Sequence, residues 1–331
     1  MNGWRIVNHL RSLAVASLAL LPACGSRPTV SAPDPQTAPL ELAGLHNVFQ
    51  VRPGLWSGSS PEGDAGFASL KQLGIKTIIS VDGAKPDVET ARRHGLRYVH
   101  LPIGYDGVPH EQGLRLARAV RDLPNPVYIH CHHGKHRGPA AATAICRCLD
   151  KSCGVEQARQ ILQRAGTDPR YVGLQATPEQ FHFVPASELD KAPADFPEIA
   201  AVPALAEAMV KVDEHWDHLN RLRANRWQLL PGEPDLTPAH EALQLAEAFQ
   251  ESARLPPRPE HSPALGESLD QSARLARELE ASLRTLPLDS EKAEVLHRKL
   301  AAGCRDCHSR FRDVPQARPD AGKPAPGVVR Y

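Results

Sequence analysis

A short run in the middle of the chain combines residues that could bind and attack a phosphate group. In VYIHCHHGKHRG, His130 and Cys131 directly follow an apolar stretch, and Gly134 and Arg137 come after them. Backbone amides at the start of a helix bind anions, and they stabilise the thiolate, the nucleophilic form of cysteine. A guanidinium matches two phosphate oxygens. The spacing therefore predicts that residues 131–137 wrap around one oxyanion.

This pattern resembles the signature of the protein tyrosine phosphatase superfamily, which reads His-Cys, two residues, Gly, two residues and Arg. The resemblance covers about residues 46–165 and looks like the dual-specificity-like branch of bacterial phosphatases. It implies that Cys131 forms a phosphocysteine intermediate, that Arg137 binds phosphate and the transition state, and that His130 supports the loop. The implied phosphate-binding residues are His132, His133, Gly134, Lys135, His136, Arg137 and Gly138.

Two further positions bear on this resemblance. Gly138 departs from the signature, because the family has a serine or threonine there whose hydroxyl helps the thiolate leave. The family also requires an aspartic acid that protonates the leaving oxygen and then activates water. Asp106 is predicted for this role, because its glycine-flanked loop in PIGYDGVP can move over a substrate. Asp82, which follows IISV at the same sheet edge, is the alternative.

The loop histidines admit other interpretations. His130, His132, His133 and His136 suggest a metal site, but four histidines on one tight loop cannot all converge on one ion. Imidazoles at the variable positions could instead make the affinity for anions rise at lower pH. A loop that binds an anion without catalysis is the alternative to an enzyme, and Gly138 keeps this alternative open.

A second motif lies near the end of the chain, where Cys304, Cys307 and His308 form C-x-x-C-H. This is the pattern of covalent haem attachment, in which the thiols bind the haem vinyls and the histidine ligates iron. A zinc half-site or a disulfide is the alternative, but the sequence holds no second C-x-x-C. The motif predicts one covalently bound haem c.

The C-x-x-C-H motif lies in a predicted helical domain, residues 198–313. Apolar residues recur at spacings of three and four in four segments, which predicts four helices in an antiparallel bundle. With C-x-x-C-H in the last helix, the region resembles cytochrome c′ and its six-coordinate relatives. The resemblance implies Arg312 as a residue beside the haem. Met209 in the first helix is considered as the sixth iron ligand, and His215 and His218 are less favoured because they lie off the apolar stripe.

The first residues predict export. Arg5 and Arg11 precede an apolar run and a cysteine, which is the layout of a signal peptide over residues 1–23. LPAC resembles a bacterial lipobox and predicts lipidation of Cys24, with simple secretion as the alternative. Residues 24–43 then predict a flexible tether. Haem c is attached outside the cytoplasm in bacteria, so the C-x-x-C-H motif and the signal peptide both indicate the periplasm. The lipobox adds a membrane anchor, and the chain is predicted to be a periplasmic, membrane-anchored lipoprotein.

In such an oxidising compartment cysteines can pair. Beyond Cys24, the two haem cysteines and Cys131, three cysteines remain, namely Cys146, Cys148 and Cys153. Two of them are expected to pair and one to stay free, and the sequence leaves the pairing open.

Between 44 and 183, short β-branched runs alternate with helical segments. The alternation predicts an α/β domain with a mainly parallel sheet covered on both faces, and ligands bind beyond the carboxyl ends of such strands. Residues 184–197 predict a linker, and 314–331 a disordered tail. With 39 Lys and Arg against 38 Asp and Glu, no global charge indicates nucleic acid.

The sequence thus predicts an exported phosphatase linked to a c-type haem bundle that senses redox state or a small gas. Its substrate would be a phosphorylated protein or a small phosphate ester. The alternative is an electron-transfer or gas-binding cytochrome, served by a periplasmic redox partner or a diatomic gas ligand, whose first domain only binds an anionic partner.

Overall fold

The computed structural model describes Met1, residues 38–255 and residues 263–313. The predicted signal peptide, the lipidation site Cys24, most of the tether and the tail 314–331 lie outside these residues. Among the helices that the description covers, none has both the length and the hydrophobicity that a membrane span requires.

The first part is built on one sheet. Its strands are β1 (Leu40–Leu42), β2 (Leu45–Arg52), β3 (Leu55–Gly58), β4 (Thr77–Ser80), β5 (Arg97–His100) and β6 (Val127–His130). They lie in the order β1-β2-β3-β6-β4-β5. The neighbours β3, β6, β4 and β5 pair in parallel, whereas β1, β2 and β3 pair antiparallel. The predicted α/β class with a mainly parallel sheet is confirmed.

Helices cover both faces of this sheet. They are α1 (Gly63–Gln72), α2 (Val88–Arg93), α3 (His110–Asp122), α4 (Arg137–Leu149), α5 (Val155–Ala165), α6 (Val172–Gln175), α7 (Thr177–Gln180) and α8 (Ala186–Leu189). Neighbouring strand residues point to opposite faces. Ile79 and Ile129 accordingly pack with α3, α4 and α5, whereas Ile78 and Tyr128 pack with α1 and α2.

The boundaries of this part differ from the expected tether and linker. The sheet begins at Leu40, inside the expected tether 24–43. At the other end, Val184 and Leu189 are buried in the core of the sheet domain, Ala192 is buried as well, and α8 lies within the expected linker 184–197. Proline and alanine content suggested a linker there, but it does not prevent apolar side chains from packing.

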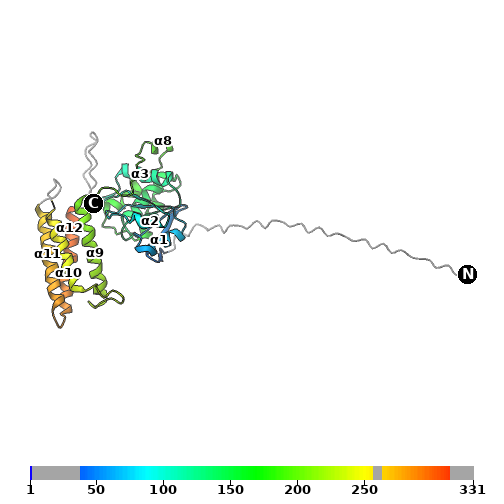
Figure 1. Cartoon of the computed structure of the whole chain (residues 1–331). Helices are drawn as coiled ribbons and strands as arrows, with labels where there is room; N and C mark the ends of the chain where they lie inside the picture. Colours follow the sequence, from blue (N-terminus) through cyan, green and yellow to red (C-terminus); the bar gives the residue numbers. More distant parts are fainter. Residues whose placement is uncertain (2–37, 256–262, 314–331) are drawn as a thin grey trace. The chain divides into compact units, whose positions relative to one another are not determined.

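The second part consists of four long helices that lie side by side (Figure 1). They are α9 (Ala204–Ala224), α10 (Pro238–Ala253), α11 (Pro263–Arg284) and α12 (Ser290–Phe311). Their shared core contains Leu219, Leu245, Ala276 and Leu300, each fully buried, from all four helices. These residues belong to the apolar stripes of the sequence, so burial of the stripes accounts for the four-helix arrangement.

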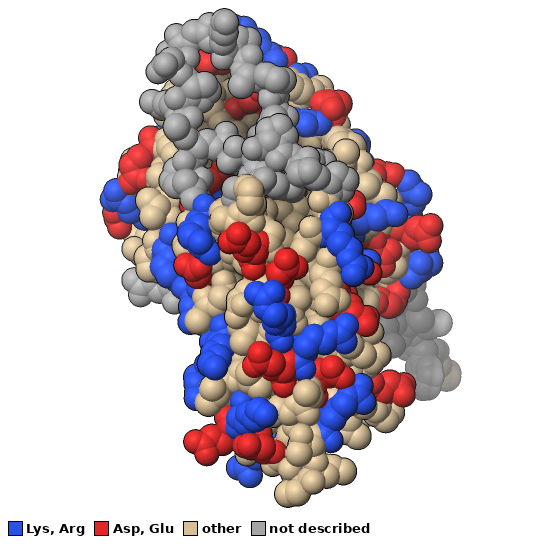
Figure 2. All heavy atoms as spheres, turned by 90° about the vertical axis from the view of Figure 1, so that its left-hand side faces the viewer, with Lys and Arg blue, Asp and Glu red and all other residues tan. Residues whose placement is uncertain are grey.

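The surface drawn in Figure 2 carries basic and acidic side chains interspersed, in agreement with a formal net charge of +1. Exposed pairs such as Arg284 with Glu280, 2.6 Å apart, lie along the helices. Because exposed ion pairs contribute little to stability, the apolar core is the main source of cohesion between the helices.

Candidate active site

The cysteine motif lies at the carboxyl end of the central parallel strands. Cys131 directly follows β6, and Arg137 is the first residue of α4. Since β4 runs parallel to β6, Asp82, two residues beyond the end of β4, lies at the same edge. This is the edge where α/β sheets bind ligands.

Hydrogen bonds hold the carbonyl groups of the loop outward. The carbonyl oxygens of His132, Gly134 and Lys135 accept hydrogen bonds from Ser60 N (2.9 Å), Asn47 Nδ2 (2.9 Å) and Thr167 Oγ1 (2.6 Å) respectively. In a trans peptide the N–H points away from the C=O. The amides of the three following residues therefore point toward the inside of the loop, as a cradle for an anion requires.

Glycines permit this backbone path. Gly134 has φ +68°, and a Cβ there would lie 2.2 Å from the carbonyl carbon of Gly58, so no other residue fits. Gly138, at the position where the resembled family has a hydroxyl, is less confined. A Cβ at Gly138 would lie 3.1 Å from Cys131 N, which requires only a small shift.

The side-chain carboxylate of Asp82 already occupies two donors of the loop, the His132 amide and the Arg137 guanidinium. Both carboxylate oxygens of Asp82 lie 3.2 Å from Arg137 Nη2, and Asp82 also accepts a hydrogen bond from the His132 amide. Burial opposes ionisation of this carboxyl and is the largest single influence, but Arg137, His132 and the Ala84 amide together outweigh it and lower the pKa of Asp82 to about 2. Asp82 is thus ionised at neutral pH and is unsuited to donate a proton, which disfavours it as the general acid.

Cys131 is only 2% exposed. Asp82 and Arg137, by contrast, line the cavity in front of the loop. A substrate phosphate that reaches the thiol must therefore take over the donors that Asp82 uses here.

His130 supports the loop from the core. Its Nε2 lies 2.7 Å from the hydroxyl of Tyr98, and both residues are buried. Burial lowers the pKa of His130 to about 4, so its imidazole is neutral at neutral pH. A neutral, fixed ring fits the supporting role that the resemblance implies.

Asp106 lies half-buried in the loop between β5 and α3. Its backbone carbonyl packs against α6, where a Cβ on Gly173 would come within 1.8 Å of it. The neighbouring Tyr105 stacks on Arg137, with the guanidinium 4.4 Å from the ring centroid. The Asp106 loop is thus adjacent to Arg137, the predicted phosphate-binding residue, and Asp106 stays the predicted general acid. Sequence reasoning missed Tyr105, for which adjacency to Asp106 was the only signal.

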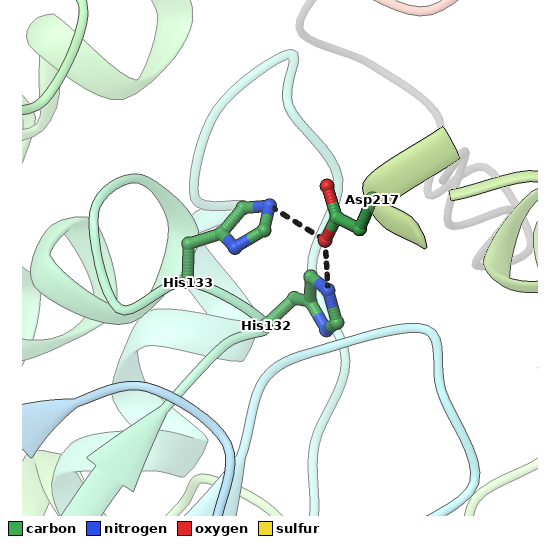
Figure 3. Close-up of side chains that lie close together, drawn as sticks. All are labelled: His132, His133 and Asp217. Atoms are coloured by element: carbon green, nitrogen blue, oxygen red, sulfur yellow. Dashed lines mark hydrogen bonds and ion pairs between the residues drawn. The ribbon is translucent and has the colours of Figure 1, made fainter. Parts of the chain in front are cut away.

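Two loop histidines face carboxylates of α9 (Figure 3). The Nε2 atoms of His132 and His133 lie 3.3 and 3.9 Å from Asp217 Oδ2, and Asp213 lies 3.8 Å from His132. The hydrogen bond to Asp217 raises the pKa of His132, whereas burial lowers the pKa of His133. Burial also lowers the pKa of His136 to about 4. The loop histidines were expected to respond to pH together, but the pKa of His132 is raised whereas the pKa values of His133 and His136 are lowered. The sequence carried no signal for the α9 carboxylates.

The haem motif and the phosphate loop line one cavity of about 470 Å³, a size typical of cofactor and substrate pockets. Its wall includes three of the predicted haem residues, Cys304, Cys307 and His308, as well as Met209. Phe249, Leu269 and Ala301 add apolar surface. The cavity is lined by apolar and charged side chains, and its two thiols, imidazole and thioether are a donor set that fits a covalently bound haem.

Arg312 also lines this cavity, and it contacts residues next to the phosphate loop. Its guanidinium stacks on the ring of Tyr105 at 3.9 Å and lies 3.4 Å from the hydroxyl of Tyr171. The predicted haem neighbour is therefore also a neighbour of the ring that stacks on Arg137.

The other histidines of α9 lie apart from this cavity. His215 and His218 both contact Glu241 of α10, and neither is among the residues that line the cavity.

Several solved structures, phosphatases among them, are similar to part of this chain. The chain is 22% identical to TpbA of Pseudomonas aeruginosa, over 46% of this chain and 98% of that chain, with a TM-score of 0.36. A TpbA variant in complex with phosphotyrosine is 23% identical to this chain, over 45% of this chain and 94% of that chain, with a TM-score of 0.30. The core catalytic domain of the PP-IP phosphatase SIW14 from Saccharomyces cerevisiae was solved in complex with citrate. It is 17% identical to this chain, over 46% of this chain and 93% of that chain, with a TM-score of 0.39.

No protein-family model matches the chain, and no curated protein matches it. At these identities the likeness to solved structures concerns the fold, so the chemistry assigned to the site depends on the geometry of the loop.

Proposed function

We propose that the chain is a cysteine-dependent phosphatase that hydrolyses phosphate monoesters. One observation carries the proposal: the His132 amide and the Arg137 guanidinium converge on a single anionic group, the carboxylate of Asp82. Donors arranged for one anion, on the loop that begins with the cysteine at the end of β6, are what phosphoryl transfer to sulfur requires.

The proposed reaction has two steps. In the first, the thiolate of Cys131 attacks phosphorus, an S–P bond forms, and the P–O bond to the leaving group breaks. Arg137 and the loop amides hold the phosphoryl oxygens, and Asp106 transfers its proton to the leaving oxygen. In the second, Asp106 takes a proton from water as water attacks phosphorus. The S–P bond then breaks, releasing inorganic phosphate and the thiolate.

The substrate is proposed to be a phosphorylated protein or a small phosphate ester. TpbA has been solved with phosphotyrosine, which makes phosphotyrosine the first probe to try. An aryl phosphate is the second, because its hydrolysis is easily followed.

The test is hydrolysis of an aryl phosphate by the full chain. We expect turnover that vanadate inhibits and that Cys131→Ser abolishes. Cys148→Ser, at a buried thiol of α4, is the matched control and should retain activity. Phosphate binding without hydrolysis would instead support the second candidate, a docking module. Gly138 and the ion pair between Asp82 and Arg137 are the observations that favour this alternative.

We further propose that the four-helix region holds one covalent haem c. Cys304 and Cys307 would form the thioethers and His308 would ligate iron, with Met209 as a candidate for the sixth position and Arg312 beside the haem. The bound group would supply electron exchange or binding of a diatomic gas. The donor set around the cavity supports this proposal. An absorption spectrum of the pyridine-treated chain tests it, and Cys304→Ser with Cys307→Ser should release the haem.

The shared cavity suggests that the two functions are coupled. The proposal is that the redox state of the haem, or a gas bound to it, changes the phosphatase rate. Rates measured with the haem oxidised, reduced, and exposed to nitric oxide would test this. Equal rates in all three states would refute the coupling but leave the phosphatase proposal intact.

Export and lipidation are proposed from the first 24 residues alone. Fractionation of cells should place the chain in the periplasm at a membrane, and Cys24→Ala should release it from the membrane.

A further inference from the structure

A cluster of metal-binding side chains lies between two helices of the four-helix region. His215 and His218 stand three residues apart on α9, so they project from the same face. Glu241 lies in the first turn of the neighbouring helix α10. From this cluster we propose that His215, His218 and Glu241 bind a divalent transition metal ion, for which Zn²⁺ is the probe.

The three donor atoms already converge. Nδ1 of His215 and Nδ1 of His218 each lie 2.9 Å from the same oxygen of Glu241, Oε2. All three ligand atoms lie within 4.8 Å of one another. Donors around a tetrahedral zinc ion, bound at about 2.0–2.2 Å, are separated by roughly 3.3 Å. Small side-chain rotations are therefore enough to place an ion between the three atoms.

The surroundings of Glu241 favour a positive ion. This glutamate is only 6% exposed and packs beside the apolar core of the four helices. A buried carboxylate is unfavourable unless it is paired or coordinates a metal. Its Oε2 is the oxygen that both histidines contact. A cation bound between the three side chains would pair with this buried carboxylate.

The composition of the cluster indicates the class of metal. Two imidazole nitrogens and one carboxylate oxygen are the ligands of many catalytic zinc sites and of other first-row transition ions. Mg²⁺ and Ca²⁺ prefer sites built from oxygen atoms alone. The two histidine side chains are 21% and 27% exposed, so an ion has an entry path and can keep a water ligand.

A second cluster in the described residues, His132, His133 and Asp217, is the weaker candidate. Its carboxylate is 37% exposed, and the ring of His133 lies 3.9 Å away. It also lies on the phosphate loop, where the histidines have another role. It is therefore useful as an internal control.

The test is zinc binding to the full chain, measured by calorimetry and by metal content after dialysis. We expect the wild type to bind Zn²⁺, and Glu241→Gln to weaken the dissociation constant of this site by at least about tenfold. His240→Gln changes an exposed histidine one residue earlier on α10 and should have no effect. The double variant His132→Gln and His133→Gln should retain the site that Glu241→Gln removes.

Circular dichroism of each variant checks that the helices persist. Crystals of the wild type soaked in Zn²⁺ give a second measurement that needs no variant: anomalous scattering at the zinc edge should place an ion between the three side chains. The proposal is overturned if the wild type binds no zinc, if Glu241→Gln binds it equally well, or if the anomalous peak lies elsewhere.

Discussion

At the scale of single residues, the central feature is a carboxylate in the position where a phosphate should bind. Asp82 satisfies the amide of His132 and the guanidinium of Arg137 with one charged group. Two anions cannot share these donors without strong repulsion. Asp82 is therefore expected to compete with substrate and to hold Arg137 in place when no substrate is bound.

This competition predicts the effect of Asp82→Asn. The variant keeps the shape of the side chain but removes its charge, so inorganic phosphate should inhibit about tenfold more strongly, equivalent to about 1.4 kcal/mol. Inhibition of aryl phosphate hydrolysis by phosphate measures this. Weaker inhibition would mean instead that Asp82 mainly positions Arg137.

Gly138 predicts slow breakdown of the phosphocysteine. Gly138→Ser would return a hydroxyl near the sulfur, and its Cβ, 3.1 Å from Cys131 N, requires only a small shift of the loop. One added hydrogen bond to the leaving thiolate should raise the steady-state rate about tenfold. Stopped-flow measurement should show a burst in the wild type that is reduced in the variant. A variant whose rate is unchanged, with the same burst, would show that the hydroxyl is not limiting.

At the scale of elements, α9 contacts the phosphate loop through His132 and Asp217. The pKa of His132 is raised above its ordinary value of 6.5. The stabilisation from this ion pair is therefore complete below pH 6.5 and is lost as the pH rises through the higher pKa of the folded state. Asp217→Asn should lower the pKa of His132, which NMR titration of the imidazole can follow. An unchanged His132 titration would argue against the contact.

The end of α4 and the turn before α5 bring two cysteines together. The thiols of Cys146 and Cys153 interact, which raises the pKa of Cys146 and lowers the pKa of Cys153, and both residues are buried. In an oxidising compartment a thiol oxidant should remove two electrons and two protons from this pair and form an S–S bond. For such a short loop the bond should raise the free energy of unfolding by about 2 kcal/mol. Non-reducing peptide mapping should find the Cys146–Cys153 link, and Cys148→Ser should leave it intact. A link that involves Cys148 would contradict this pairing.

At the scale of the whole molecule, the haem motif and the phosphatase site are connected through aromatic stacking. Arg312 and Arg137 both stack on Tyr105, and Arg312 lies four residues after the predicted iron ligand His308. A change at His308 can therefore reach the ring that packs on Arg137.

Arg312→Ala should reduce the dependence of the phosphatase rate on the redox state of the haem, while the haem spectrum persists. The measurement is the ratio of rates with oxidised and reduced haem. Arg310→Ala, at a more exposed position two residues earlier, is the matched control. A ratio that Arg312→Ala leaves unchanged would exclude this route of coupling.

The local spacing of residues in the sequence was sufficient to predict much of the fold and to find the two motifs. The alternation of strands and helices predicted the α/β class, and the apolar stripes predicted all four long helices, because both patterns follow from the geometry of a single element. The Cys-x5-Arg loop and the C-x-x-C-H motif are likewise short, and their donors are neighbours along the chain.

Only the tertiary structure brought together residues that are distant in sequence. It decided that Asp82 contacts Arg137 of the loop and that Tyr105 stacks on both Arg137 and Arg312. It also placed Glu241 against two histidines of another helix. Such contacts depend on how helices and strands pack against one another, and the periodicity of one segment carries no information about its partner.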